Sequence, residues 1–116
     1  MRYEGLDPVS REELLRLLAN PDAPEQAVVR ALLGMALQEA YGPWAEARCL
    51  EALHQERLSV RKAAAQGLGH VARRHGLVDP RRVVGELSAR AEELGGAGED
   101  ALDDIAVYCR RAWLEQ

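Results

Sequence analysis

The sequence predicts an all-α fold of three antiparallel helical hairpins stacked side by side. Its 116 residues are rich in Ala, Leu, Arg and Glu and contain no Phe. These four abundant residue types form helices well because they lose little side-chain freedom there. Apolar residues recur at three- and four-residue intervals, and no stretch alternates long enough to form a strand. A chain of this length is expected to form one domain over residues 1–116.

The first hairpin is predicted over residues 10–41. Ser10 and Glu13 have the spacing of a capping box, in which the hydroxyl accepts a hydrogen bond from a backbone N–H and the carboxylate reaches back to the cap. Asp22 and Glu25 repeat that spacing and predict the start of a second helix. Two helices joined by so short a link are expected to pack against each other as a hairpin.

Two more hairpins are predicted over residues 43–76 and 80–114, which gives six helices in all. Ser59 is expected to cap the second helix of the middle hairpin. Asp79-Pro80 combines a capping residue with a proline at the first helical position, and therefore predicts the start of the fifth helix. The glycine-rich run 95–98 is expected to be a flexible loop between the last two helices.

Apolar spacing indicates which helix faces are buried. Gly67 and Gly69 lie inside the fourth helix, where each costs roughly 1 kcal/mol relative to Ala, and close approach of a neighbouring helix is the expected compensation. The predicted buried stripe of this helix contains Val60, Ala64, Gly67, Leu68, Val71 and His75. The predicted stripe of the sixth helix contains Ala101, Leu102, Ile105, Ala106, Tyr108, Cys109 and Trp113.

The middle hairpin carries a motif of a known repeat class. Its second helix begins Ser59-Val60-Arg61-Lys62-Ala63-Ala64-Ala65 and continues to Leu68-Gly69. This run resembles the VR-x-x-A-A…L-G signature of HEAT repeats, and helical hairpins recur along the chain at the 31–37-residue spacing that we count from the sequence, as in helical solenoids. In the last hairpin Ala97-Gly98 replaces Val-Arg, so that repeat is degenerate or a cap.

The resemblance extends to a narrower group. Residues 68–73 and 99–105 are similar to segments of small bacterial HEAT-like proteins, some of which resemble toxin-immunity proteins. The family resemblance implies a curved helical stack, a HEAT-like α-α superhelix, that binds other macromolecules. It implies no catalysis.

The residues themselves also argue against an enzyme. A catalytic nucleophile needs an adjacent base and a third group that orients the base, and no such Ser/His/Asp or Cys/His set is legible. We therefore expect no catalytic residues, no cofactor and no metal site. Cys49 and Cys109 are expected to be reduced and buried. No leader or membrane-spanning run is evident, so a cytoplasmic location is expected.

Charge is distributed unevenly along the chain. The formal net charge is −4, residues 43–90 carry 9 positive and 5 negative groups, and residues 91–116 carry 2 and 7. Four carboxylates, those of Glu99, Asp100, Asp103 and Asp104, lie at the start of the sixth helix and form the candidate surface for a protein partner. Stabilisation by the helix dipole would account for the same cluster, and so would ion pairs between the hairpins. Both of these alternatives stay open.

In the ion-pair alternative, Asp103 or Asp104 would contact His70, Arg73 or Arg74 of the fourth helix. A basic group consisting of Arg73, Arg74, Arg81 and Arg82 is the candidate for nucleic-acid binding. Arg81 and Arg82 lie near a helix N-terminus, which does not favour cations. They therefore suggest either a bound anion or internal carboxylates such as that of Glu86. An ordinary solvated face is the simpler interpretation, because no aromatic residue accompanies the cluster to stack on bases.

These patterns support three functional hypotheses. The leading hypothesis is a protein–protein interaction module, in its most specific form an immunity or antitoxin-like protein that binds and occludes a basic toxin. Acidic terminal segments would then steer the partner electrostatically. The second is a nucleic-acid-binding HEAT-like protein that uses the basic cluster, and the third is a structural adaptor subunit.

Overall fold

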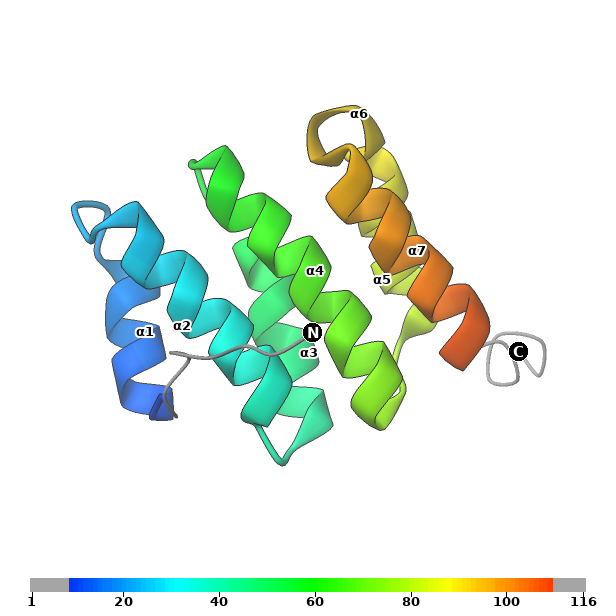
Figure 1. Cartoon of the computed structure of the whole chain (residues 1–116), viewed down its shortest axis with the longest axis horizontal. Helices are drawn as coiled ribbons and strands as arrows, with labels where there is room; N and C mark the ends of the chain where they lie inside the picture. The colour runs from blue at the N-terminus through cyan, green and yellow to red at the C-terminus, as the bar shows by residue number, and fades with distance from the viewer. Residues whose placement is uncertain (1–8, 110–116) are drawn as a thin grey trace.

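The computed structural model describes residues 9–109, which form seven α-helices and no strand (Figure 1). The helices are α1 (Arg11–Ala19), α2 (Glu25–Gln38), α3 (Gly42–Ala52), α4 (Leu58–His75), α5 (Pro80–Ala89), α6 (Ala91–Leu94) and α7 (Gly96–Tyr108). The all-α class predicted from the sequence is therefore confirmed.

The helices form a stack of three hairpins, as the spacing of caps and stops predicts. The hairpins are α1/α2, α3/α4 and the set α5, α6 and α7. In Figure 1 the second helices of the hairpins, α2, α4 and α7, lie side by side in the nearer layer, and α1, α3 and α5 lie behind them. Helix α4 is central, because it packs against α2, α3 and α7.

Two of the predicted helix starts have the expected side-chain caps, and two do not. The Ser10 hydroxyl accepts a hydrogen bond from the Glu13 amide at 3.1 Å, and the Asp79 carboxylate accepts one from the Arg82 amide at 3.2 Å. Helix α2 is preceded instead by Pro24, without a side-chain cap. Helix α4 starts one residue before Ser59, whose hydroxyl bonds the side chain of Glu25 on the neighbouring hairpin.

The last hairpin corrects two predictions. The fifth helix does not run unbroken, because Arg90 leaves the helical conformation and separates α5 from the one-turn α6. The run 95–98 is not a flexible loop, because α7 already starts at Gly96. Gly95 alone makes the turn, with a φ of +53° that suits glycine. Gly98 is buried, and a Cβ there would lie 3.0 Å from the Cβ of Leu94.

The core lies along α4, which contributes nine buried residues, more than any other helix. The close approach expected at its glycines is present. A Cβ on Gly67 would lie 2.8 Å from the Sγ of Cys49, and one on Gly69 would lie 2.8 Å from the Oδ2 of Asp104. Small residues on α4 therefore allow α3 and α7 to pack close to its axis. Fully buried large side chains of the core include Leu14, Leu32, Leu53, Leu68, Leu87 and Leu94.

The predicted stripe of the last helix is only partly correct. Ala101, Ile105 and Cys109 are buried, whereas Ala106 is exposed and Tyr108 as a whole residue is 52 % exposed. The reason is position in the stack. Helix α7 packs on α4 and α5 and, among the described residues, has no further hairpin on its outer side. Trp113, which the same spacing places on this stripe, lies outside the described residues.

The prediction that His75 belongs to the buried stripe of α4 is wrong, because this residue is exposed at the end of that helix. Its ring packs over the start of α3, where a Cβ on Gly42 would lie 2.7 Å from its Cβ. Cys49 and Cys109 are both free and buried, as predicted. Burial raises the pKa of the Cys49 thiol to about 12. Within residues 9–109 no helix is both long and apolar enough to cross a membrane.

Candidate functional site

Two of the four acidic residues at the start of α7 line a cavity, and the other two do not. Asp100 and Asp104, one helical turn apart, line a cavity of about 310 Å³ between α4 and α7. Glu99 and Asp103 are exposed and do not line it. The remaining residues around the cavity come from α2, α4 and α7 and are Leu33, Gln66, His70, Arg73 and Ala101. The cavity therefore opens on the layer formed by the second helices, and we call it the groove cavity.

One wall of the groove cavity holds an ion pair between hairpins. The Arg73 guanidinium lies 3.5 Å from the Asp104 carboxylate, with side chains 44 % and 28 % exposed. Arg73 also donates to the Nδ1 atom of His70 at 2.9 Å. The pairing predicted from the sequence between α4 and α7 is thus present for Asp104 and Arg73. At that length and exposure such a pair contributes only about 0–1 kcal/mol.

His70 is held in an environment that favours its neutral form. Burial lowers the pKa of its imidazole, and the Arg73 cation lowers this pKa further. The Asp104 carboxylate raises it, but by less than burial lowers it. A neutral ring can accept the hydrogen bond that Arg73 donates, whereas a protonated ring has no acceptor. The direction of the pKa shift therefore agrees with the observed bond.

Asp100 differs from Asp104 in having no hydrogen-bond or ion-pair partner among the described residues. Within residues 9–109 its carboxylate makes no hydrogen bond or ion pair, although it lines the cavity. The position of both residues depends on Gly69, which faces Asp104 and the Cα of Ala101 across the contact between α4 and α7. As far as residues 9–109 show, the groove cavity thus presents one unpaired carboxylate and one that is weakly paired.

The predicted basic group is dispersed by the fold. Arg74 donates to the carbonyl oxygens of Ala36 at 2.9 Å and Glu39 at 3.1 Å, and so caps the C-terminal end of α2. Arg73 lies in the groove cavity, whereas Arg82 lines a different cavity on the side of α3 and α5. These residues therefore do not converge on one anion-binding surface.

Arg81 and Arg82 lie in the first turn of α5, as expected. The Arg82 side chain is 61 % exposed and its Nε lies 4.0 Å from the Glu86 carboxylate. For Arg82 the structure therefore supports an internal carboxylate as the partner. Arg81 is exposed, and its use in binding stays a prediction.

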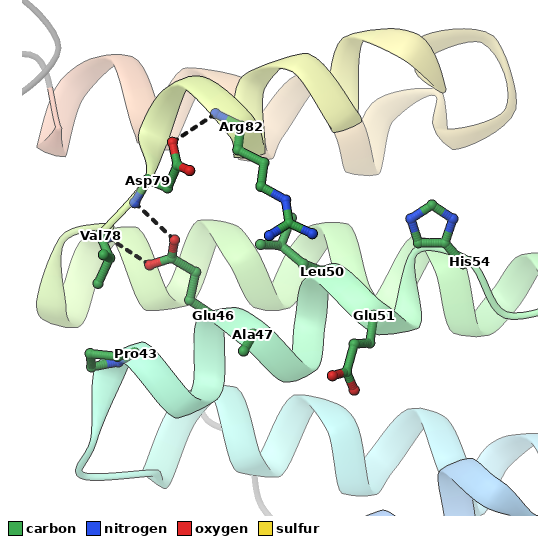
Figure 2. Close-up of a pocket in the computed structure, with 9 residues that line it drawn as sticks. All are labelled: Pro43, Glu46, Ala47, Leu50, Glu51, His54, Val78, Asp79 and Arg82. Atoms are coloured by element: carbon green, nitrogen blue, oxygen red, sulfur yellow. Dashed lines mark hydrogen bonds between the residues drawn. The ribbon is translucent and has the colours of Figure 1, made fainter. Parts of the chain in front are cut away.

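The second cavity, of about 420 Å³, lies between α3 and α5 (Figure 2). We call it the outer cavity. Its most buried polar residue is Glu46, whose side chain and backbone together are 5 % exposed. The two carboxylate oxygens accept hydrogen bonds from the backbone N–H groups of Val78 at 2.7 Å and Asp79 at 3.1 Å. Glu46 therefore holds the segment that leads into α5.

Sequence reasoning missed Glu46, although a signal was present. It lies on the buried face of α3 among Ala45, Cys49 and Leu50, and a charged residue on an apolar stripe is rarely buried without partners. In Figure 2 the Arg82 side chain extends across the outer cavity toward Leu50. Every carboxylate of this cavity is engaged, because Glu51 pairs with Arg48 and Asp79 caps α5.

Trp44 lies at the start of α3, where two arginine side chains pack against its ring. The guanidinium groups of Arg11 and Arg48 lie 4.6 Å and 5.1 Å from its ring centroid. Arg11 also makes two hydrogen bonds to the carboxylate of Glu39 at the end of α2. This set of contacts joins the first hairpin to the second.

No group of three or more His, Cys, Asp or Glu side chains within residues 9–109 could hold a metal ion. No protein-family model matches the sequence, and no curated protein matches it closely enough to carry an argument.

Among solved structures, the chain is similar to a chain in the crystal structure of a contact-dependent inhibition (CDI) complex from Cupriavidus taiwanensis LMG 19424. The two share 28 % sequence identity and superpose with a TM-score of 0.77. The match covers 93 % of this chain and 97 % of the other, so the whole stack of hairpins is shared and not one repeat.

Proposed function

We propose that this chain is a non-enzymatic immunity protein that binds a toxin and occludes it. The observation that carries the proposal is the similarity to a chain of a CDI complex over nearly the full length of both chains. CDI is a toxin–immunity system, and the adjacent helices α2, α4 and α7 offer a broad face to a protein partner. The resemblance of the middle hairpin to HEAT repeats supports the same type of function.

The groove side of the stack is the proposed contact face. It is formed by α2, α4 and α7, and it contains the groove cavity with its available carboxylates. The net charge of −4 suits a basic partner, because complementary charge raises the association rate and suppresses wrong partners. Nucleic acid is less well supported, since Arg73, Arg74 and Arg82 point to separate surfaces and each has an internal partner.

The test uses the proteins encoded by the genes that adjoin the gene of this chain, and a protein that stops growth when it is expressed alone is taken as the toxin domain. The two proteins are expressed together, and the complex is purified and measured by calorimetry and by size-exclusion chromatography with light scattering. We expect a stoichiometric complex, and we expect cells that produce the toxin domain to grow only when this chain is present. A folded toxin domain that neither binds the chain nor is neutralised by it would overturn the proposal.

The same preparation tests the nucleic-acid alternative. Fluorescence anisotropy with labelled single-stranded and double-stranded RNA and DNA at low salt should show no saturable binding. Tight binding that weakens steeply as salt rises would favour the alternative instead, because release of counterions from phosphates produces that dependence.

A further inference from the structure

The groove cavity is large enough to hold a single side chain. Its volume of about 310 Å³ is at the lower end of the range of roughly 300–1,000 Å³ for pockets that hold small molecules. Leu33 and Ala101 supply apolar wall, and Gln66 supplies a neutral polar group. A long side chain with an aliphatic stem and a polar head would fill such a space.

The charges around the cavity select the head group. Asp100 and Asp104 carry one negative charge each, Arg73 carries one positive charge, and His70 accepts a hydrogen bond from Arg73 as a neutral ring. The lining therefore has an excess of one negative charge. Of the four groups only Asp100 has no partner within the described part of the chain, so the excess charge is located at the wall formed by α7.

We propose that the groove cavity receives a lysine or arginine side chain of the protein partner, with the carboxylates of Asp100 and Asp104 as its acceptors. This inference rests on the proposed function and specifies how the same face recognises its partner. Glu99 and Asp103, on the exposed side of the same helix, belong to the solvated surface and take no direct part.

Arg73 helps to keep the cavity ready for a partner. Its guanidinium lies 3.5 Å from Asp104 and the side chain is 44 % exposed, so it can move aside or share the carboxylate at little cost. Without any counter-charge, Asp100 and Asp104 would repel each other one turn apart on α7. An incoming cation would relieve that repulsion more completely than Arg73 alone, since it can contact both carboxylates.

Two double variants with equal changes of charge test the inference in the complex. Asp100→Asn with Asp104→Asn neutralises the cavity pair, and Glu99→Gln with Asp103→Asn neutralises the outer pair of the same helix. Long-range steering falls by a similar amount in both. We expect the first double variant to raise Kd for the toxin domain at least tenfold, mostly through faster dissociation, and the second to change it less than about threefold.

A probe that does not require the toxin gives an independent test. Isolated, isotopically labelled chain is titrated by NMR with N-acetyl-arginine amide and N-acetyl-lysine amide, and with N-acetyl-norleucine amide as the uncharged control. We expect the basic probes to shift the amide signals of Gln66, Asp100 and Ala101 more than signals elsewhere, and we expect the Asp100/Asp104 variant to lose this response. Circular dichroism and thermal melting check that all variants are folded.

The outcomes separate the two proposals. If the toxin binds and both double variants weaken it equally, or if the basic probes cause no localised shifts, the inference is wrong and the proposed function stands. If the wild-type chain does not bind the toxin, the proposed function is wrong, and the NMR titration still decides whether the cavity binds basic side chains.

Discussion

The outer cavity and the groove cavity both contain carboxylates, yet these carboxylates have different roles. Glu46 in the outer cavity is nearly inaccessible, and both of its oxygens accept hydrogen bonds from the backbone before α5. Asp100 in the groove cavity is exposed and has no partner in the described part of the chain. The oxygens of Glu46 already accept hydrogen bonds within the fold, whereas the carboxylate of Asp100 remains available to another molecule.

The number of free carboxylate acceptors is therefore a better guide to where a partner can bind than the number of acidic residues. A buried carboxylate that satisfies two N–H groups cannot be removed without leaving donors unsatisfied. An exposed carboxylate without partners contributes little to folding, and it can bind a cation without breaking an internal contact. Substitutions at the two cavities and at the helix contacts between them should therefore differ widely in their effect on stability.

Replacing Glu46 should destabilise the fold most. Glu46→Ala removes the acceptor for the amides of Val78 and Asp79, and we expect the free energy of unfolding to fall by about 2–4 kcal/mol, since each unsatisfied donor costs about 1–3 kcal/mol. Urea denaturation followed by circular dichroism measures the change. Glu51→Ala is the matched control, because Glu51 lines the same cavity but is 63 % exposed in its side chain and, within the described part of the chain, pairs only with Arg48.

We expect the control to change stability by less than about 1 kcal/mol, as is usual for an exposed ion pair. If Glu46→Ala were as mild as Glu51→Ala, the outer cavity would contain no structural anchor, and the contrast between the two cavities would disappear.

Helix α4 lies between α3 and α7, and its glycines allow each contact to be tested separately. Gly67→Ala places a Cβ 2.8 Å from the buried Sγ of Cys49, and overpacking of this kind should lower the free energy of unfolding by about 1–2 kcal/mol despite the better helix propensity of Ala. Gly69→Ala should cost less, because the nearest atom is the movable carboxylate oxygen of Asp104. Thermal and urea unfolding measure both variants.

Gly85→Ala serves as the control for these variants. A Cβ at that position of α5 has no neighbouring atom within 4 Å, so the substitution should raise stability by up to about 1 kcal/mol through helix propensity alone. A stabilising Gly67→Ala would show that α3 and α4 are not tightly packed.

The carboxylate of Glu39 is intermediate between those of Glu46 and Asp100, because it is partly exposed but well paired. Its oxygens accept from Arg11 at 2.9 and 3.1 Å and from the Tyr41 amide at 2.9 Å. The Arg11 hydrogen bonds lower the pKa of this carboxyl from 4.5 to about 2. The ionised form is therefore favoured by folding. The resulting stability is present above the unfolded-state pKa and is lost as the pH falls through the folded-state pKa.

We therefore expect the difference in melting temperature between the wild type and Glu39→Gln to be largest near neutral pH. It should shrink as the pH falls from about 5 to about 2, because Glu39 becomes protonated over that interval. Glu56→Gln, at an exposed position, is the control for the general effect of acid. A difference that stays constant across this pH range would contradict the ion pair as the cause.

The smallest effect on stability is expected in the groove cavity. Asp100→Asn should change the free energy of unfolding by no more than about 0.5 kcal/mol, because the side chain is exposed and makes no hydrogen bond or ion pair within residues 9–109. Asp104→Asn loses only the pair with Arg73 and should cost less than about 1 kcal/mol. Urea denaturation measures both variants. A loss above about 1.5 kcal/mol at Asp100 would mean that it supports the fold in the way Glu46 does.

Much of the fold could be predicted from the sequence, because its determinants are local. The capping pairs at Ser10 and Asp79 and the apolar spacing of α4 depend on residues within one helix turn. The prediction for the run 95–98 is wrong because glycine propensity says nothing of tertiary packing, and Gly98 is held against Leu94 by such packing. The prediction for Tyr108 is wrong for a similar reason, since spacing alone cannot show which helix is last in the stack.

The candidate site was only partly predictable. Sequence patterns point to the acidic residues of α7 and to the pairing with Arg73, but they group four carboxylates into one surface. Successive residues of a helix point about 100° apart, and of the pair Glu99 and Asp100 only Asp100 lines the cavity. Which of the two faces the cavity depends on where α4 lies. Glu46 was missed because its partners are backbone N–H groups more than thirty residues away.

The parallel arrangement of α2, α4 and α7 has an electrical consequence. Arg74 connects the C-terminal end of α4 to that of α2 through its hydrogen bond to the carbonyl oxygen of Ala36. Arg73 pairs with Asp104, which lies in the C-terminal half of α7. The negative ends of three helix dipoles therefore gather at one rim of the layer and their positive ends at the opposite rim. The cations at the end of α4 offset part of the negative rim. A molecule that approaches this layer consequently encounters an electrostatic field directed from one rim to the other. The distribution of charge on that molecule determines its orientation on the layer.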